Sequence, residues 1–146
     1  MDSNLKREII LDNYQNPAKK GLIDDDTYIF QNTNNESCID NIDIMMKIEN
    51  GKICDILFDG EACAISTSAT SIMIKKLIGK SVEDAKEILK NYKNMINEEP
   101  YNKNLLDELL VYDEIYMQAN RKKCALLPYE AIEKILEGLD DENRSE

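Results

Sequence analysis

The stretch "NIDIMMKIENGKICDILF" (residues 41–58) decides the fold, because two strand-like runs flank an Asn-Gly pair. A turn of two residues at Asn50-Gly51 would mix polar and apolar side chains on each face of the hairpin. A loop of three residues, 49–51, with Gly51 in the left-handed conformation, shifts the pairing by one residue. One face then becomes apolar throughout, with the opposed pairs Ile42–Phe58, Ile44–Ile56 and Met46–Cys54. We therefore predict the three-residue loop, which places Cys54 in the core.

Helical periodicity dominates the segments outside this hairpin. Residues 3–16 predict a helix with Ser3 as its N-cap, Pro17 beyond its end, and one apolar face formed by Leu5, Ile9, Ile10 and Tyr14. Residues 27–30 predict a short strand. Further helices are expected at 64–78, at 81–96 behind a capping-box pattern, and over at least the first half of 104–117.

The last segment predicts a closing helix that begins at Cys124, because Pro128 is tolerated in the first turn of a helix. Residues 139–146 form a frayed acidic tail in this interpretation. A helix, then strands, then helices indicate the α+β class, with a small antiparallel sheet covered on one side by helices. At 146 residues the chain is expected to form one domain, residues 1–146.

Charge and hydropathy limit the classes of partner and the compartment. The net charge of −11 argues against nucleic acid or an anionic membrane as the main partner. No apolar run is long enough to span a bilayer, and no signal peptide is visible. We therefore expect a cytoplasmic protein, in which thiols stay reduced and cysteines serve as ligands or reactive groups more often than as disulfide partners.

The chain has four cysteines and no histidine. No two cysteines have the spacing of a zinc ribbon or of a thioredoxin-type redox pair. A nucleophile activated by histidine is excluded, and the glycine-rich phosphate-binding motifs are absent. Any chemistry of the thiols therefore depends on which of them meet in space.

Three of the thiols are predicted at the ends of elements that can converge. Cys38 precedes the hairpin, Cys63 follows it, and Cys124 begins the closing helix. Cys54 lies in mid-strand and cannot join them. Asp40 points the same way as Cys38 if the strand has already begun there. Three thiolates and one carboxylate suit tetrahedral Zn²⁺.

Such a set carries four negative charges against two on the ion, and it therefore needs positive charge nearby. The sequence "RKK" (121–123), next to Cys124, is the densest basic cluster, and a helix N-terminus after Cys63 would add partial positive charge. Each feature also has a purely structural interpretation. A free cysteine is commonly a small buried hydrophobe, Asp40 would serve as a turn or cap residue, and "RKK" would form a solvated face.

Four ordered motifs resemble the iron–sulfur assembly proteins of the IscU/NifU N-terminal type, in particular the SufU branch. They are "ILDNYQNPAKKGLI" (10–23), "SCID" (37–40), "FDGEACAIS" (58–66) and "RKKCALLPYEAIEKIL" (121–136). The likeness runs from Lys6 to Leu136. The SufU branch is favoured because IscU-type members carry a histidine shortly before the last cysteine, where this chain has Arg121. The long segment 79–120 also matches an insertion typical of that branch.

The resemblance implies a zinc site formed by Cys38, Asp40, Cys63 and Cys124. It implies a sulfurtransferase-like carrier that takes persulfide sulfur onto Cys124 from a PLP-dependent cysteine desulfurase of the SufS kind. Arg121 would stabilise the freed thiolate or persulfide. The family also suggests a monomer that docks on the desulfurase and serves a downstream Fe–S assembly complex.

Three positions differ from the family pattern. Ile39 replaces a glycine between the cysteine and the aspartate, "NES" (35–37) replaces an Asn-Pro pair, and Pro128-Tyr129 replace an Ala-Trp pair. Two alternative functions stay open. One is a scaffold that builds and delivers a transient [2Fe–2S] cluster on the same residues, which the missing histidine disfavours. The other is an interaction module in which zinc only fixes loops.

Overall fold

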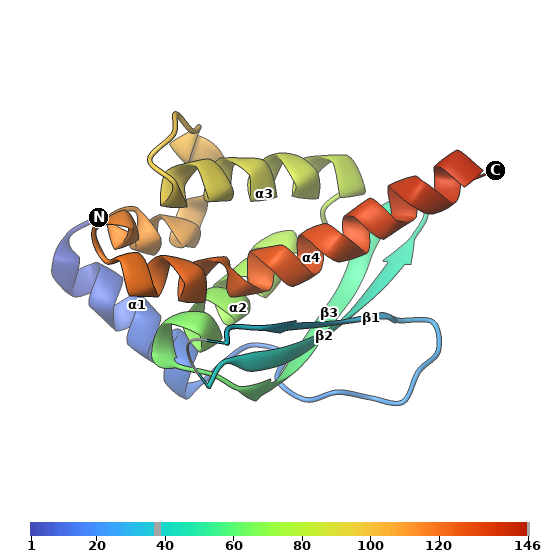
Figure 1. Cartoon of the computed structure of the whole chain (residues 1–146), viewed down its shortest axis with the longest axis horizontal. Coiled ribbons are helices and arrows are strands. Elements are labelled where there is room, and N and C mark those ends of the chain that lie inside the picture. Colours follow the sequence, from blue (N-terminus) through green and yellow to red (C-terminus); the bar gives the residue numbers. More distant parts are fainter. Residues whose placement is uncertain (37–38, 146) are drawn as a thin grey trace.

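The computed structural model describes residues 1–36 and 39–145, with side chains described as far as Asp140. It places a three-stranded antiparallel sheet beside a set of helices, in the strand order β1-β2-β3 (Figure 1). The elements in chain order are α1 (Ser3–Gln15), β1 (Ile29–Asn34), β2 (Asn41–Glu49), β3 (Lys52–Glu61), α2 (Ala64–Leu77), α3 (Val82–Ile96), three short 3₁₀ helices (η1 Lys103–Leu105, η2 Asp107–Tyr112, η3 Ile115–Met117) and α4 (Ala119–Ser145). The predicted α+β class is confirmed.

The helices are stacked on one side of the sheet. In Figure 1, α4 runs between the sheet and α3, and α1 lies at one end of the molecule. Helix α2 is the centre of the fold, since it packs against α1, α4 and β3. It is buried on nearly all sides, whereas the sequence predicted an amphipathic helix. Its small side chains allow this close packing, and its buried hydroxyls all have hydrogen-bond partners.

The hairpin register differs from the predicted one. The turn has two residues, Asn50 and Gly51, both with positive φ, so Glu49 pairs with Lys52. The register then shifts between Lys47 and Ile48, and the extra residue on β3 is Cys54. Beyond this bulge the apolar face is restored in the pairs Ile44–Phe58 and Met46–Ile56.

Because of this bulge, the prediction that Cys54 lies in the core is wrong. Cys54 is exposed, whereas Ile53 and Ile56 on either side of the bulge are fully buried. A bulge of one residue solves the same problem that the three-residue loop was expected to solve, because each shifts the pairing until apolar residues oppose one another.

The final helix is longer than predicted at both ends. It begins at Ala119, so Cys124 lies in its second turn, and Pro128 lies well inside the helix instead of in its first turn. The backbone remains helical as far as Ser145, where an acidic tail was expected from residue 139.

Smaller differences concern the N-terminal half and the segment before α4. The N-cap of α1 is Asp2, whose carboxylate accepts from the N–H of Leu5, instead of Ser3. The expected apolar face of α1 is only partly covered, and Tyr14 is exposed. Strand β1 starts two residues later than expected and extends through polar residues, because β2 supplies partners for their backbone. Residues 103–117 form 3₁₀ turns, and the positive φ of Asp107 interrupts them.

Candidate metal site

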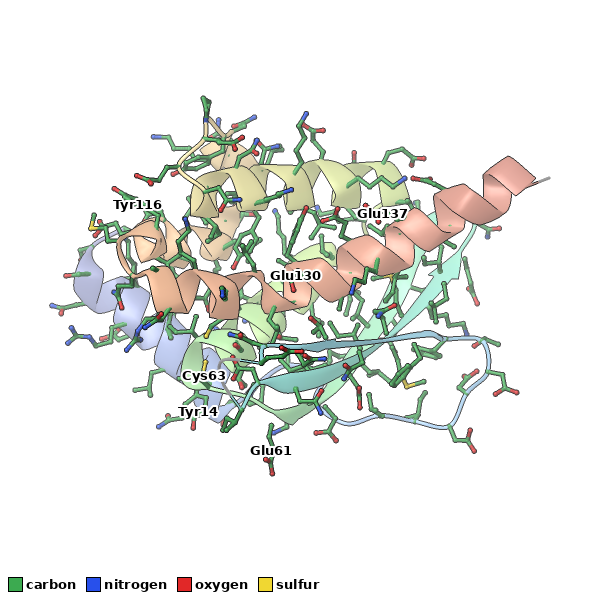
Figure 2. The ribbon with its side chains drawn as sticks, viewed as in Figure 1. Tyr14, Glu61, Cys63, Tyr116, Glu130 and Glu137 are labelled. Carbon is green, nitrogen blue, oxygen red and sulfur yellow. The ribbon has the colours of Figure 1, made fainter. Side chains whose placement is uncertain are left out.

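The site forms where the sheet ends beside the first turns of α2 and α4. Asn41, the first residue of β2, pairs with Glu61, the last residue of β3. Asp40 and Cys63 lie just beyond this pair, one on each side, so the ladder brings them together although they are far apart in sequence. In Figure 2, Cys63 lies at this end of the sheet and Glu61 points away from it.

Gly60 allows the two strands to close at this end. Its φ is +134°, and a Cβ atom there would lie 2.1 Å from the carbonyl oxygen of Asn41. An ordinary side chain at position 60 would therefore push β2 and β3 apart immediately before the site.

Asp40 and Cys63 contact each other directly. The backbone N–H of Cys63 donates to Oδ1 of Asp40 at 2.7 Å, and the Cys63 sulfur lies 3.6 Å from Oδ2. Cys63 is also the N-cap of α2, because its sulfur accepts from the N–H of Ser66 at 3.4 Å. The start of α2 thus fixes the direction of the Cys63 side chain.

Helix α4 brings the second described thiol into the site. The ligand atoms of Asp40, Cys63 and Cys124 all lie within 4.8 Å of one another. Asp40 is 1% exposed and Cys124 is 7% exposed, while Cys63 is half-buried. The structure therefore brings together three of the four residues that the sequence singled out as metal ligands.

These three donors fit a zinc ion. Zn–S bonds of about 2.3 Å and Zn–O bonds of about 2.0–2.2 Å set ligand atoms about 3.4–3.8 Å apart in a tetrahedron. The 3.6 Å between the Cys63 sulfur and the Asp40 oxygen lies in that range. Two sulfurs and one oxygen also form a donor set that zinc accepts.

The remaining two cysteines have different places. Cys38 lies outside the described residues. Asp40 was expected to point the same way as Cys38 if the strand had already begun there. Strand β2 begins one residue later, at Asn41, so this condition is not met. Cys54 lies at the bulge on β3 and is not part of the cluster. Ile39, next to Asp40, is 73% exposed.

Burial and close contact change the pKa values of two groups in the site. Burial raises the pKa of Asp40, but hydrogen bonds from Ser66, from the backbone of Cys63 and from the two thiols lower it more, so the net pKa is below its usual value. Burial first, and then the neighbouring Cys63 and Asp40, raise the pKa of Cys124 to about 12. The carboxylate is thus ready to bind a cation, whereas the buried thiol is neutral until positive charge comes close.

An open cavity of about 450 Å³ adjoins the two thiols. It is lined by Asn35, Cys63, Ala64, Ile65, Asn120, Arg121 and Cys124. Arg121 is the member of the "RKK" cluster that lines this cavity, while Lys123 lines a neighbouring hollow with Glu36 and Glu130. A guanidinium therefore lies beside the place where an anion bound to Cys124 would extend.

Comparison with known proteins identifies the family of this chain. The family model described as NifU-like N-terminal domain matches residues 5–137. The chain belongs to this family. Its resemblance to the IscU/NifU N-terminal proteins, inferred above from four motifs, is confirmed.

Two curated relatives of this NifU-like domain represent two activities. The chain is 32% identical to the zinc-dependent sulfurtransferase SufU of Bacillus subtilis, over 89% of this chain and 88% of that protein. It is also 32% identical to the iron–sulfur cluster assembly scaffold protein IscU of Thermotoga maritima, over 88% of this chain and 90% of that protein.

Solved structures agree with the fold. A proposed iron–sulfur cluster assembly scaffold protein for the SUF system from Fervidobacterium islandicum is 31% identical, with a TM-score of 0.84 over 88% of this chain and 94% of that chain. A NifU-like N-terminal protein from Brucella abortus shares the fold at 15% identity, with a TM-score of 0.82 over 96% of this chain and 99% of that chain. Among the described residues of this NifU-like domain, no helix is long and apolar enough to cross a membrane.

Sequence reasoning missed one residue of the site, Ser66. Its hydroxyl lies 2.6 Å from Oδ2 of Asp40, 3.4 Å from the Cys63 sulfur and 3.2 Å from the carbonyl oxygen of Cys124. The signal was its place three residues after Cys63, one helical turn along α2 from the N-cap. The sequence alone does not distinguish Ser66 from Ser68 or Ser71, which lie in the same run of small residues.

Proposed function

We propose that this chain is a zinc-dependent sulfur carrier of the SufU type that serves iron–sulfur cluster assembly. The observation that carries the proposal is the meeting of Asp40, Cys63 and Cys124 within 4.8 Å, beside a cavity that Arg121 lines. The similarity to the sulfurtransferase of B. subtilis supports the same function.

The metal in this proposal is held by Asp40, Cys63 and Cys124, with Cys38 as the fourth ligand. Zinc would keep the thiols deprotonated and protect them from oxidation until a partner displaces one of them. Asp40 suits a fixed ligand, because it is buried and accepts hydrogen bonds from the Cys63 backbone and from Ser66. Cys124 suits the ligand that leaves, because Arg121 lines the open cavity beside it, whereas Cys63 is held as the N-cap of α2.

The sulfur donor is a PLP-dependent cysteine desulfurase of the SufS kind, which carries a persulfide on its own cysteine. The Cys124 thiolate attacks the outer sulfur of that persulfide. The sulfur–sulfur bond of the donor breaks, a new one forms on Cys124, and the donor thiolate leaves, so no external oxidant is needed. Arg121 donates hydrogen bonds to the resulting persulfide anion, which then passes to a downstream Fe–S assembly complex.

The cavity has room for such an exchange. Its volume of about 450 Å³ can admit a side chain of the partner that approaches Cys124 from outside. We infer a monomer that docks on the desulfurase with this corner, and a cytoplasmic location in which the thiols remain reduced.

A cluster scaffold is the second candidate, supported by the equal identity to the T. maritima scaffold. It would place a transient [2Fe–2S] cluster on the same cysteines. The chain has no histidine to complete such a ligand set, which favours sulfur transfer. A module whose zinc only fixes loops predicts that cysteine variants lose stability without a specific loss of sulfur transfer.

The test measures alanine production by the cognate desulfurase with and without this protein. We expect stimulation that Cys124→Ala abolishes and that the matched variant Cys54→Ala retains, because Cys54 is exposed and distant from the cluster. Anaerobic reconstitution with iron and sulfide distinguishes the scaffold function from the sulfur carrier. A scaffold would give a coloured protein that passes its cluster to an apo-ferredoxin. Absence of stimulation by the wild-type protein refutes the sulfur carrier.

A further inference from the structure

Pro128 changes the hydrogen bonding of the turn that carries Cys124. In an α-helix the carbonyl of Cys124 accepts from the N–H of the residue four positions later, which is Pro128. Proline has no N–H, so the helix cannot supply this bond. Because α4 continues through Pro128, the carbonyl of Cys124 needs a donor from elsewhere.

Two neighbouring helices supply donors to this stretch of α4. The Ser66 hydroxyl from α2 donates to the carbonyl of Cys124 at 3.2 Å, and both groups are buried. The Tyr92 hydroxyl from α3 donates to the next carbonyl, that of Ala125, at 2.7 Å. The turn that carries Cys124 is therefore held in place from outside by side chains.

Ser66 also connects the other two donors of the cluster. Its hydroxyl lies 2.6 Å from Asp40 Oδ2 and 3.4 Å from the Cys63 sulfur. Ser66 is fully buried, so its contacts are shielded from bulk solvent. A hydroxyl has a single proton, and Asp40 and the Cys124 carbonyl therefore compete for it.

We propose that Ser66 is a positioning residue that helps to hold Cys124 in the donor cluster, and that Pro128 leaves the Cys124 carbonyl dependent on this one hydroxyl. When Cys124 leaves the cluster, its turn breaks a side-chain hydrogen bond instead of a helical one, and the Ser66 proton turns fully to Asp40. The inference that this hydrogen bond serves to release Cys124 to a sulfur donor rests on the proposed function.

The test is a double-mutant cycle on zinc-free protein, with Ser66→Ala and Pro128→Ala alone and combined. The readout is the rate at which iodoacetamide alkylates Cys124, located by mass spectrometry, with exposed Cys54 as the internal reference. Ser66→Ala leaves the Cys124 carbonyl without its donor, and we expect Cys124 to react about tenfold faster. That factor corresponds to about 1.4 kcal/mol, which is within the range for an unsatisfied buried acceptor.

Alanine at position 128 restores an N–H to the helix and gives the Cys124 carbonyl a second donor. In that background we expect Ser66→Ala to accelerate alkylation less than about threefold. Contacts of Ser66 with Asp40 and Cys63 are lost equally in both backgrounds, so the difference isolates the bond to Cys124. Ser68→Ala is the control, because Ser68 is buried in the same helix and contacts Tyr112 instead of the cluster.

An equal acceleration in both backgrounds, or none in either, would overturn the proposal. If Ser66→Ala fails to fold, Pro128→Ala alone decides, since the added N–H should slow alkylation of Cys124 and an unchanged rate contradicts the mechanism. The measurement involves neither zinc nor a sulfur donor. Its failure therefore leaves the sulfur-transfer assay unaffected, and a failed sulfur assay leaves this result unaffected.

Discussion

Gly60→Ala is the substitution that should most directly separate the two strands at the edge of the site. The added Cβ would lie 2.1 Å from the carbonyl oxygen of Asn41, whereas real Cβ atoms do not approach closer than 3.0 Å. The strands must therefore part by about 1 Å at the residue pair that aligns Asp40 with Cys63. Backbone strain at positive φ adds to this clash.

The expected cost follows from these two contributions. Strain at such a φ amounts to about 1–3 kcal/mol, and loss of a ladder hydrogen bond adds about 0.5–1.5 kcal/mol. We expect Gly60→Ala to lower the free energy of unfolding by about 3 kcal/mol, measured by urea denaturation of zinc-free protein. Zinc affinity, measured by competition with a chelator, should fall as well, because the ladder places Asp40 against Cys63.

Two other glycines are matched controls. Gly21 also has positive φ, but a Cβ there meets nothing within 4 Å, so Gly21→Ala tests strain without a clash. Gly138 lies in α4 with open space around it, and Gly138→Ala should stabilise the protein by about 0.5–1 kcal/mol. A Gly60→Ala variant that is no less stable than Gly21→Ala, or that binds zinc as tightly as the wild type, would show that Gly60 does not hold the strands together at the site.

Two further predictions concern the hairpin and can be checked by the same unfolding assay. Burial raises the pKa of Asp55, but hydrogen bonds from Lys19 and Tyr28 lower it more, so its folded pKa is below its unfolded value. The stability that Lys19 provides through Asp55 is present above about pH 4 and is lost as pH falls through the folded pKa of Asp55, so the stability deficit of Lys19→Met should shrink as pH falls below about 4; a deficit that does not change with pH contradicts the assignment. Cys54→Ser should change stability by less than about 0.5 kcal/mol, since Cys54 is exposed, whereas Met46→Ala should cost about 2–5 kcal/mol. A large effect of Cys54→Ser would favour the three-residue loop that places Cys54 in the core.

The hairpin illustrates how far pattern reasoning reaches. The pattern correctly required Ile44 and Met46 to face apolar partners across the ladder. It could not choose between a longer turn and a bulge, because both shift the pairing by one residue. The difference decides the place of Cys54, which one solution buries and the other exposes.

The site illustrates a similar limit. The sequence predicted that the two ends of the hairpin meet, because antiparallel strands bring those ends together, and the structure brings Asp40 and Cys63 together there. Cys38, for which this meeting was predicted, lies outside the described residues. The sequence could not reveal the role of Ser66, since it does not show that Ser66 lies beside the Cys124 carbonyl, which Pro128 leaves without a helical donor. The sequence rule that confines proline to the first turn of a helix placed the start of that helix five residues too late.

X-ray absorption at the zinc edge of the purified protein tests the proposed ligand set, because it identifies the atoms bound to the ion. We expect one zinc ion per chain, with sulfur neighbours at about 2.3 Å and an oxygen neighbour at about 2.0–2.2 Å. Cys124→Ala should lose one sulfur neighbour, while Cys54→Ala should give the wild-type spectrum. A protein without zinc, or a sulfur count that Cys124→Ala leaves unchanged, would contradict this ligand set.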